Sequence, residues 1–217
     1  MKRTMAIFGA TRGLGSQLFE SFHPQEKYDV IGIGSKYVNV CEKQEVDDFF
    51  SSNQPDIVVY GSAINIDGTW AKYSPDDFDD MVNTNITGFY NVLTAALQCM
   101  KDQQYGRFIT LSSILSQKPL RGTGVYSACK AFMDNAVKSS ALEMARHGVT
   151  VNSIQLGYHQ GGLTEKVPEK VLEAAVKQIP VGRLGKGEEI ARTIEWLIDS
   201  PYITGTNVSQ SGGLSTC

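Results

Sequence analysis

Short runs of β-branched and aromatic residues alternate along this chain with segments whose apolar residues recur at helical spacing. Seven runs have the composition of strands, namely Thr4–Phe8, Asp29–Ile33, Tyr37–Val40, Asp56–Tyr60, Arg107–Leu111, Val149–Ile154 and Thr206–Ser209. The clearest helical segment extends from Phe78 to Leu97, with an apolar residue at every third or fourth position. Strands that alternate with helices form a parallel sheet covered by helices on both faces. We therefore predict one α/β domain over residues 1–217, built on a doubly wound parallel sheet of about seven strands.

Several element boundaries can be predicted as well. Ser74 and Pro75, followed by two aspartates, are typical of a helix start. His147 and Gly148 are typical of a helix end, because glycine adopts the left-handed cap and histidine complements the helix dipole. Only a few residues separate the second predicted strand from the third, so the helix that would connect them is missing. We expect one sheet face near this edge to be bare, or to be covered by a partner.

Composition narrows the classes of function. The chain has 217 residues, of which 41% are hydrophobic and 20% charged, and a net charge of −3 with a pI near 5.6. Its basic residues are scattered, which predicts neither a nucleic-acid nor a membrane partner. Its cysteines and histidines show no metal-ligand spacing, and we predict no metal site. The first ten residues fit a strand better than a signal peptide, and no apolar run approaches the roughly 18 residues of a membrane span. A reduced, cytoplasmic protein is expected.

The first predicted strand runs into a glycine-rich turn. Gly9, Gly13 and Gly15 lie just before a helix expected over Ser16–Phe22. Glycines at such a junction let the backbone approach a pyrophosphate, and the helix N-terminus supplies N–H groups and a partial positive charge. An ordinary glycine-rich turn would show the same spacing. Its place at the first strand–helix junction favours a nucleotide site.

A second pattern concerns proton transfer. Tyr126 and Lys130 are four residues apart, and a helix places such residues on one face. A free phenol has a pKa of about 10, and we expect the neighbouring ammonium to lower it toward the working range. Ser113 and Asn85 precede this pair. The pair alone would equally fit an exposed helix face, so its weight comes from the glycine-rich turn and the two polar residues.

Together these motifs resemble the short-chain dehydrogenase/reductase family over nearly the whole chain, with 3-oxoacyl-carrier-protein reductases and similar carbonyl reductases nearest in pattern. The turn GATRGLG matches the family's glycine motif, and Asn85, Ser113, Tyr126 and Lys130 match its catalytic tetrad in order and spacing. Asn39-Val40, GVTVN at 148–152, RLGKGEEIA, ITG and the GG at 212–213 also match. The resemblance implies a single NAD(P)-binding Rossmann domain.

The resemblance also implies a mechanism and a set of cofactor contacts. Hydride would pass from NAD(P)H to a carbonyl, Tyr126 would donate the proton, and Ser113 would hold the developing alkoxide. Lys130 would acidify Tyr126 and bind the nicotinamide ribose, while Asn85 would anchor a relay water. Cofactor contacts are implied for Gly9, Thr11, Arg12, Gly13, Leu14, Gly15, Ser35, Lys36, Asn39, Val40, Gly61, Tyr126, Lys130 and Gly157.

Cofactor choice depends on the end of the second strand. An acidic residue there would bind the ribose hydroxyls of NAD and repel the extra phosphate of NADP. This chain has Ser35 and Lys36 instead, with Arg12 in the glycine-rich turn. We predict NADP(H) over NAD(H), although these cations would look the same as plain surface charges.

The chain departs from the family pattern at three places. The usual NNAG segment is replaced by Tyr60–Ala63, which puts any adenine contact there in doubt. Phe8 replaces a threonine before Gly9, and Leu156 replaces the proline before Gly157. None of these changes removes a proton-transfer residue.

Residues 158–180 resemble the family's substrate lid. An amphipathic stretch begins at Pro168, and its apolar side fits equally well a cover over a ligand or packing on the core. His159 fits an exposed loop histidine better than a substrate contact. By resemblance we also expect a homodimer or homotetramer, formed through two long helices at Pro75–Met100 and Val125–Arg146.

Three functions are compatible with these motifs to different degrees. The first is a ketoreductase acting on a small carbonyl or secondary-alcohol substrate. The second is a redox-sensing regulator that binds dinucleotide without turnover, which would have no need for Ser113, Tyr126 and Lys130 together. The third, a sugar-nucleotide epimerase of the extended branch, would need a larger C-terminal substrate domain.

Overall fold

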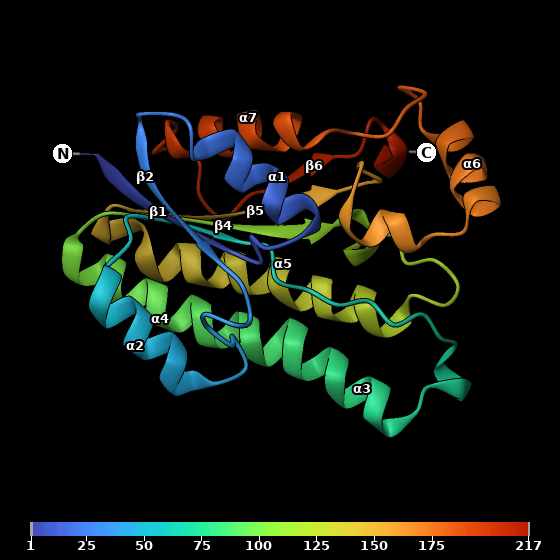
Figure 1. Ribbon diagram of the computed structural model, residues 1–217, viewed down its shortest axis with the longest axis horizontal. Helices are drawn as coiled ribbons and strands as arrows, with labels where there is room; N and C mark the ends of the chain where they lie inside the picture. Colours follow the sequence, from blue (N-terminus) through green and yellow to red (C-terminus); the bar gives the residue numbers. More distant parts are fainter. Residues whose placement is uncertain (1, 217) are drawn as a thin grey trace.

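A single six-stranded parallel sheet forms the centre of the molecule (Figure 1). The computed structural model describes residues 2–216. The strands are β1 Arg3–Phe8, β2 Tyr28–Ile33, β3 Ile57–Tyr60, β4 Gly106–Ser113, β5 Val149–Leu156 and β6 Asn207–Gln210. They lie in the order β2-β1-β3-β4-β5-β6, so the winding direction reverses between β1 and β3. In open parallel sheets, ligands bind beyond the carboxyl ends of the strands at this reversal.

The prediction of a strand at Tyr37–Val40 is wrong, and the sheet has six strands in place of about seven. The N–H groups of Tyr37 and Val38 both donate to the Gly34 carbonyl, at 2.9 and 3.0 Å, which makes this segment a turn. Val38 and Val40 point into the core, with 4% and 8% of their surface exposed. Three residues cannot carry the chain to a parallel neighbour, so β2 stays at the sheet edge.

Helix α2 (Lys43–Asn53) follows this turn and leads to β3. The prediction that a connecting helix is missing was therefore wrong, because Tyr37–Val40 is not a strand and α2 connects β2 to β3. Phe49 and Phe50 of α2 pack on Phe8 of β1, with ring centroids 5.5 and 6.0 Å away. The sheet face expected to be bare is thus covered by the chain itself.

Helices cover both faces of the sheet (Figure 1). On one face lie α1 Gly13–Phe22 and α7 Gly187–Ile198, and on the other α2, α4 Gly88–Gln103 and α5 Gly124–Met144. Alternate residues of each strand enter the two apolar cores: Phe8 and Phe108 face α4 and α5, whereas Ile7 and Ile109 face α1 and α7. Both faces of the central strands are buried, as expected for a doubly wound parallel sheet.

The helix predicted over Pro75–Met100 is interrupted. It consists of α3 Pro75–Val82, a π-helical turn at Asn83–Thr87, and α4. Its start is confirmed, because the Asp77 N–H donates to Ser74 Oγ at 3.0 Å. Single π turns inside α-helices occur often at functional positions. This one contains Asn85.

The remaining elements are short. Helix α6 covers Glu169–Gln178, and 3-10 turns lie at Trp70–Lys72, Ile114–Ser116, Ala145–His147, Gly162–Lys166 and Leu214–Thr216. Gly148, with φ +73°, caps the end of the helical segment as predicted. Within residues 2–216, no helix is long and apolar enough to cross a membrane.

Candidate active site

The glycine-rich turn brings bare backbone to the carboxyl end of β1. A Cβ atom on Gly15 would lie 2.1 Å from the Gly9 carbonyl oxygen, and one on Gly9 would lie 2.9 Å from the Gly61 carbonyl carbon. Gly9 itself has a φ of +84°. The N-terminus of α1 has no side-chain cap, so its first N–H groups remain for an anion. Backbone without side chains beside an uncapped helix start fits a dinucleotide pyrophosphate.

Three predicted phosphate-binding residues lie around the end of β2. Ser35, Lys36 and Arg12 are exposed, Arg12 at the position that precedes α1. Thr11 packs closely on Gly34, where a Cβ would meet the threonine methyl at 2.2 Å. No acidic side chain follows Ile33 before residue 42.

Asn39 and Val40 lie next to this region, in the turn. The Asn39 N–H donates to Glu45 Oε2 at 2.7 Å, and Asn39 Oδ1 accepts from the Cys41 N–H at 3.2 Å. The Val40 carbonyl accepts from Asn91 Nδ2 at 3.0 Å while its side chain faces the core. The Val40 side chain therefore serves packing.

Ser113, Tyr126 and Lys130 are placed by two packed elements. Ser113 is the last residue of β4, and Tyr126 and Lys130 lie in the first two turns of α5. Lys130 Nζ donates to the Leu111 carbonyl of β4 at 2.8 Å and lies 5.6 Å from the centre of the Tyr126 ring. All three residues are at least nine-tenths buried. The end of β4 and the start of α5 thus bring the three residues to the carboxyl end of the parallel strands.

The electrostatics of the pair differ from the prediction. Burial lowers the pKa of the Lys130 ammonium to about 8, opposed by the charge of Asp134. Burial raises the pKa of the Tyr126 phenol, and Lys130 is not among the groups that shift it. The expected lowering of the Tyr126 pKa is therefore wrong for this arrangement. The hydrogen bonds of Lys130 Nζ go instead to the Leu111 carbonyl and Met133 Sδ.

Asn85 lies fully buried in the π turn. Its amide makes a two-point contact with Ile64, accepting from the Ile64 N–H and donating to the Ile64 carbonyl, both at 2.9 Å. Its nitrogen also lies 3.7 Å from Met81 Sδ, and Met81 packs in the same apolar cluster as Tyr126. Asn85 thus joins the segment after β3 to the wall of the candidate site.

Replacing Asn85 by alanine is expected to lower the free energy of unfolding by about 2 kcal/mol, because the Ile64 N–H and carbonyl lose their partner. Urea denaturation measures this change. Asn135→Ala is the matched control, since Asn135 is exposed and bonds only the Ala131 carbonyl of its own helix. Equal stability losses in the two variants would contradict the structural role given to Asn85.

Comparison with known proteins shows the family of this chain. The family described as enoyl-(acyl carrier protein) reductase matches residues 36–215. An acetoacetyl-CoA reductase of Shinella zoogloeoides is 40% identical over 161 residues, which cover 73% of this chain and 67% of the relative. A 3-oxoacyl-[acyl-carrier-protein] reductase of Rickettsia conorii is 29% identical over 232 residues, covering 98% and 96%. The chain belongs to the short-chain dehydrogenase/reductase family.

The solved structure of ElxO with NADP bound shares the fold. It has a TM-score of 0.90 and 22% identity, and the match covers 100% of both chains.

As a short-chain dehydrogenase/reductase, the protein is an NAD(P)-dependent oxidoreductase acting on C=O and CH–OH groups.

In this short-chain dehydrogenase/reductase, the segment after β5 lies against the glycine-rich turn. A Cβ on Gly13 would meet the Cα of Gly162 at 2.6 Å. The next residue, Leu163, packs on the apolar cluster that contains Tyr126. Gly157 has a packing role, because a Cβ there would lie 2.9 Å from the Ser211 Cα. The segment predicted to be a lid therefore contacts both the glycine-rich turn and the apolar cluster that contains Tyr126.

The apolar side of α6 is only partly packed. Ile179, just after the helix, is 4% exposed, and a Cβ on Gly212 would touch it at 2.8 Å. Val171 at the other end is 53% exposed. One end of this side thus packs on the C-terminal segment and the other is open to solvent.

The prediction that His159 is an exposed loop residue is wrong, since only 2% of it is exposed. Its Nδ1 lies 3.0 Å from the Gly157 carbonyl, which only accepts, so Nδ1 donates. A Cβ on Gly185 would meet the ring at 2.4 Å, and burial lowers the pKa of the imidazole. The burial of His159 thus depends on packing against Gly185, a contact with a later segment that the sequence pattern does not show.

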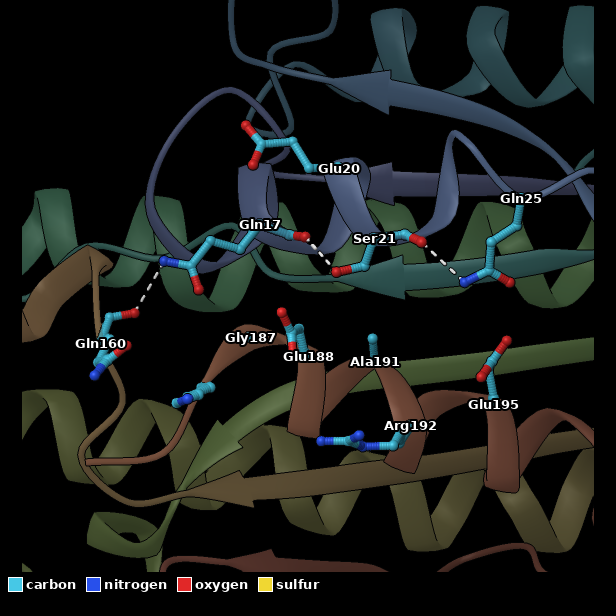
Figure 2. A pocket seen from close by; sticks show the side chains of 11 residues that line it. Gln17, Glu20, Ser21, Gln25, Gln160, Gly187, Glu188, Ala191, Arg192 and Glu195 are labelled. Carbon is cyan, nitrogen blue, oxygen red and sulfur yellow. Dashed lines mark hydrogen bonds between the residues drawn. The ribbon is translucent and has the colours of Figure 1, made fainter. Parts of the chain in front are cut away.

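A polar groove of about 730 Å³ between α1 and α7 contains none of the predicted site residues (Figure 2). Gln17 on its wall donates to the Gln160 carbonyl at 3.0 Å. The groove lies on the sheet face opposite α5, and this hydrogen bond joins α1 to the segment after β5.

Three residues that shape the site were not predicted from the sequence, namely Gln17, Leu111 and Asp134. Only Asp134 could have been found, because it lies four residues after Lys130 on the same helix.

Proposed function

We propose that the protein uses NADPH to reduce the ketone of a 3-oxoacyl thioester to the 3-hydroxyacyl product. This proposal is carried by the placement of Ser113 at the carboxyl end of β4 and of Tyr126 and Lys130 in the first two turns of α5. The glycine-rich turn follows the carboxyl end of β1 in the same parallel sheet. The relatives named as acetoacetyl-CoA and 3-oxoacyl-carrier-protein reductases support this substrate class.

Gly9, Gly13, Gly15 and the start of α1 would hold the dinucleotide, which would supply a hydride for the carbonyl carbon. Tyr126 then donates its phenol proton to the developing alkoxide. Ser113 donates a hydrogen bond to the same oxygen and stabilises its charge. Ser113 is prepared for this, because its Oγ already accepts from the Leu115 N–H at 3.2 Å, which leaves the hydroxyl proton to be donated.

Lys130 acts through its charge. As the phenol proton leaves, negative charge develops on the Tyr126 oxygen, and the Lys130 ammonium one helical turn away would offset it. The Leu111 carbonyl holds Lys130 close to the Tyr126 ring. Burial lowers the pKa of Lys130 to about 8, so we expect turnover to fall as the pH rises through that region.

The role we propose for Asn85 differs from the anchoring of a relay water that the family resemblance implies. Because its amide is committed to Ile64, the side chain holds the π turn in place. We assign any relay water to backbone groups of this turn, whose helical hydrogen bonding is irregular.

NADPH preference is expected to depend on Arg12 and Lys36. The double variant Arg12→Ala/Lys36→Ala should weaken NADPH binding about tenfold or more and leave NADH binding within about twofold, because two cations facing one phosphate are removed. Nicotinamide fluorescence measures both affinities, and Lys138→Ala, an exposed change on α5, is the control. Equal affinity of the unaltered protein for both dinucleotides would contradict the preference. The NADP bound to ElxO, which shares the fold, supports it.

Turnover itself is tested by oxidation of NADPH in the presence of acetoacetyl-CoA and a panel of other carbonyls. We expect the thioester to be reduced well above the rate of NADPH oxidation without substrate. Tight NADPH binding with no reduction of any carbonyl would favour the regulator that binds without turnover.

We also propose that the protein forms a homodimer or homotetramer through the outer side of α3, α4 and α5. Large side chains are exposed there, including Phe78, Tyr90 and Phe132 at 43%, 54% and 41%. Light scattering during size-exclusion chromatography should give two or four times the monomer mass. A monomer at micromolar concentration would contradict this assembly.

A further inference from the structure

A buried carboxylate lies one helical turn beyond Lys130. Asp134 on α5 is 4% exposed, and its two oxygens accept from Ser153 Oγ and Gln155 Nε2 of β5, both at 2.6 Å. Ser153 and Gln155 are themselves buried, at 0% and 3%. A carboxylate is costly to bury unless hydrogen bonds compensate for the lost water. Two polar residues of β5 therefore compensate for the burial of a carboxylate on α5.

One branch of this network reaches the serine of the candidate site. Gln155 Nε2 also donates to Ser116 Oγ at 3.0 Å. Ser116 ends the 3-10 turn that begins directly after Ser113, and Ser113 Oγ caps the same turn through Leu115. Gln155 thus ties the serine turn to α5 by way of Asp134.

The other branch is electrostatic and reaches the lysine. Among the described residues, the charges and titratable groups that act on Lys130 are Asp134 and Cys129, both on α5, and β4 contributes the Leu111 carbonyl. Burial lowers the pKa of Lys130 and the Asp134 charge opposes this, so the carboxylate has the right sign to keep the ammonium protonated.

We propose that Asp134 is a positioning residue for the proposed reductase reaction, keeping the Lys130 ammonium charged and, through Gln155, fixing the turn that follows Ser113. This inference rests on the roles given above to Lys130 and Ser113. Asp134 itself touches neither substrate nor cofactor.

The pH dependence of kcat separates this role from a purely structural one. In Asp134→Asn the ammonium loses the carboxylate whose charge opposes the effect of burial, so the alkaline limb of the profile should move at least about one pH unit lower. Turnover near about pH 6.5 should stay within about threefold of the unaltered protein, and turnover near about pH 8.5 should fall about tenfold or more. Asp134→Leu has a similar shape without an unpaired amide, and it should show the same shift if Asp134→Asn does not fold.

Ser153→Ala is the matched control, because it removes one hydrogen bond to Asp134 and keeps the charge. Its alkaline limb should not move. Gln155→Met tests the other branch: kcat should fall at every pH, with NADPH binding and the alkaline limb unchanged. A uniform loss of activity in Asp134→Asn, parallel to that of Ser153→Ala, would overturn the inference while leaving the proposed function intact. Absence of turnover in the unaltered protein would overturn both.

Discussion

Tyr126→Phe is expected to lose at least about 99% of turnover and to bind NADPH as tightly as the unaltered protein. Phenylalanine keeps the ring in the cluster with Met81 and Cys129 but removes the proton donor. Steady-state NADPH oxidation and nicotinamide fluorescence measure the two quantities.

Tyr73→Phe provides the control for this variant. Tyr73 packs at the edge of the same apolar cluster, but its hydroxyl donates to the Ile66 carbonyl outside the proposed chemistry. Its turnover should stay within about threefold, the scale of a small positioning effect. Unchanged turnover in Tyr126→Phe would show that the proton donor is misassigned.

Gly15→Ala is expected to abolish measurable NADPH binding and to lower the free energy of unfolding by about 3 kcal/mol. The new methyl would lie 2.1 Å from the Gly9 carbonyl oxygen and 2.7 Å from its carbon, so the backbone of the turn must move. That movement separates β1 from α1 at the point where the pyrophosphate is proposed to bind. Urea denaturation and fluorescence titration measure the two effects.

Gly182→Ala separates this clash from the general effect of replacing a glycine. Gly182 has a φ of +75°, and a Cβ there would meet nothing within 4 Å. Its substitution should cost about 1 kcal/mol from backbone strain alone and leave NADPH binding unchanged. NADPH affinity in Gly15→Ala equal to that of the unaltered protein would remove the glycine-rich turn from the cofactor site.

The features that could be predicted from sequence are those set by local geometry. The glycine spacing after β1 was informative because a Cβ at Gly15 would collide with the Gly9 carbonyl of the same turn. The four-residue spacing of Tyr126 and Lys130 was informative because α5 carries both. The cap at Ser74 was equally local.

The features that were missed depend on contacts between distant segments. Tyr37–Val40 alternates in the manner of a strand, and only the core beneath it shows that Val38 and Val40 point inward from a turn. The burial of His159 requires Gly185, and the direction of the Lys130 ammonium requires the Leu111 carbonyl on another element. Spacing within one helix shows that two groups are near each other, but only tertiary packing decides where a flexible side chain points.

In the proposed reaction, a hydride reaches a substrate ketone in this site while Tyr126 supplies the proton. The most direct measurement uses NADPH with deuterium at both C4 positions and acetoacetyl-CoA, with mass spectrometry of the product. We predict 3-hydroxybutyryl-CoA with one deuterium on the carbinol carbon, formed by the unaltered protein and nearly absent with Tyr126→Phe. Product without deuterium would contradict hydride transfer from NADPH, and equal amounts of deuterated product from both proteins would contradict Tyr126 as the proton donor.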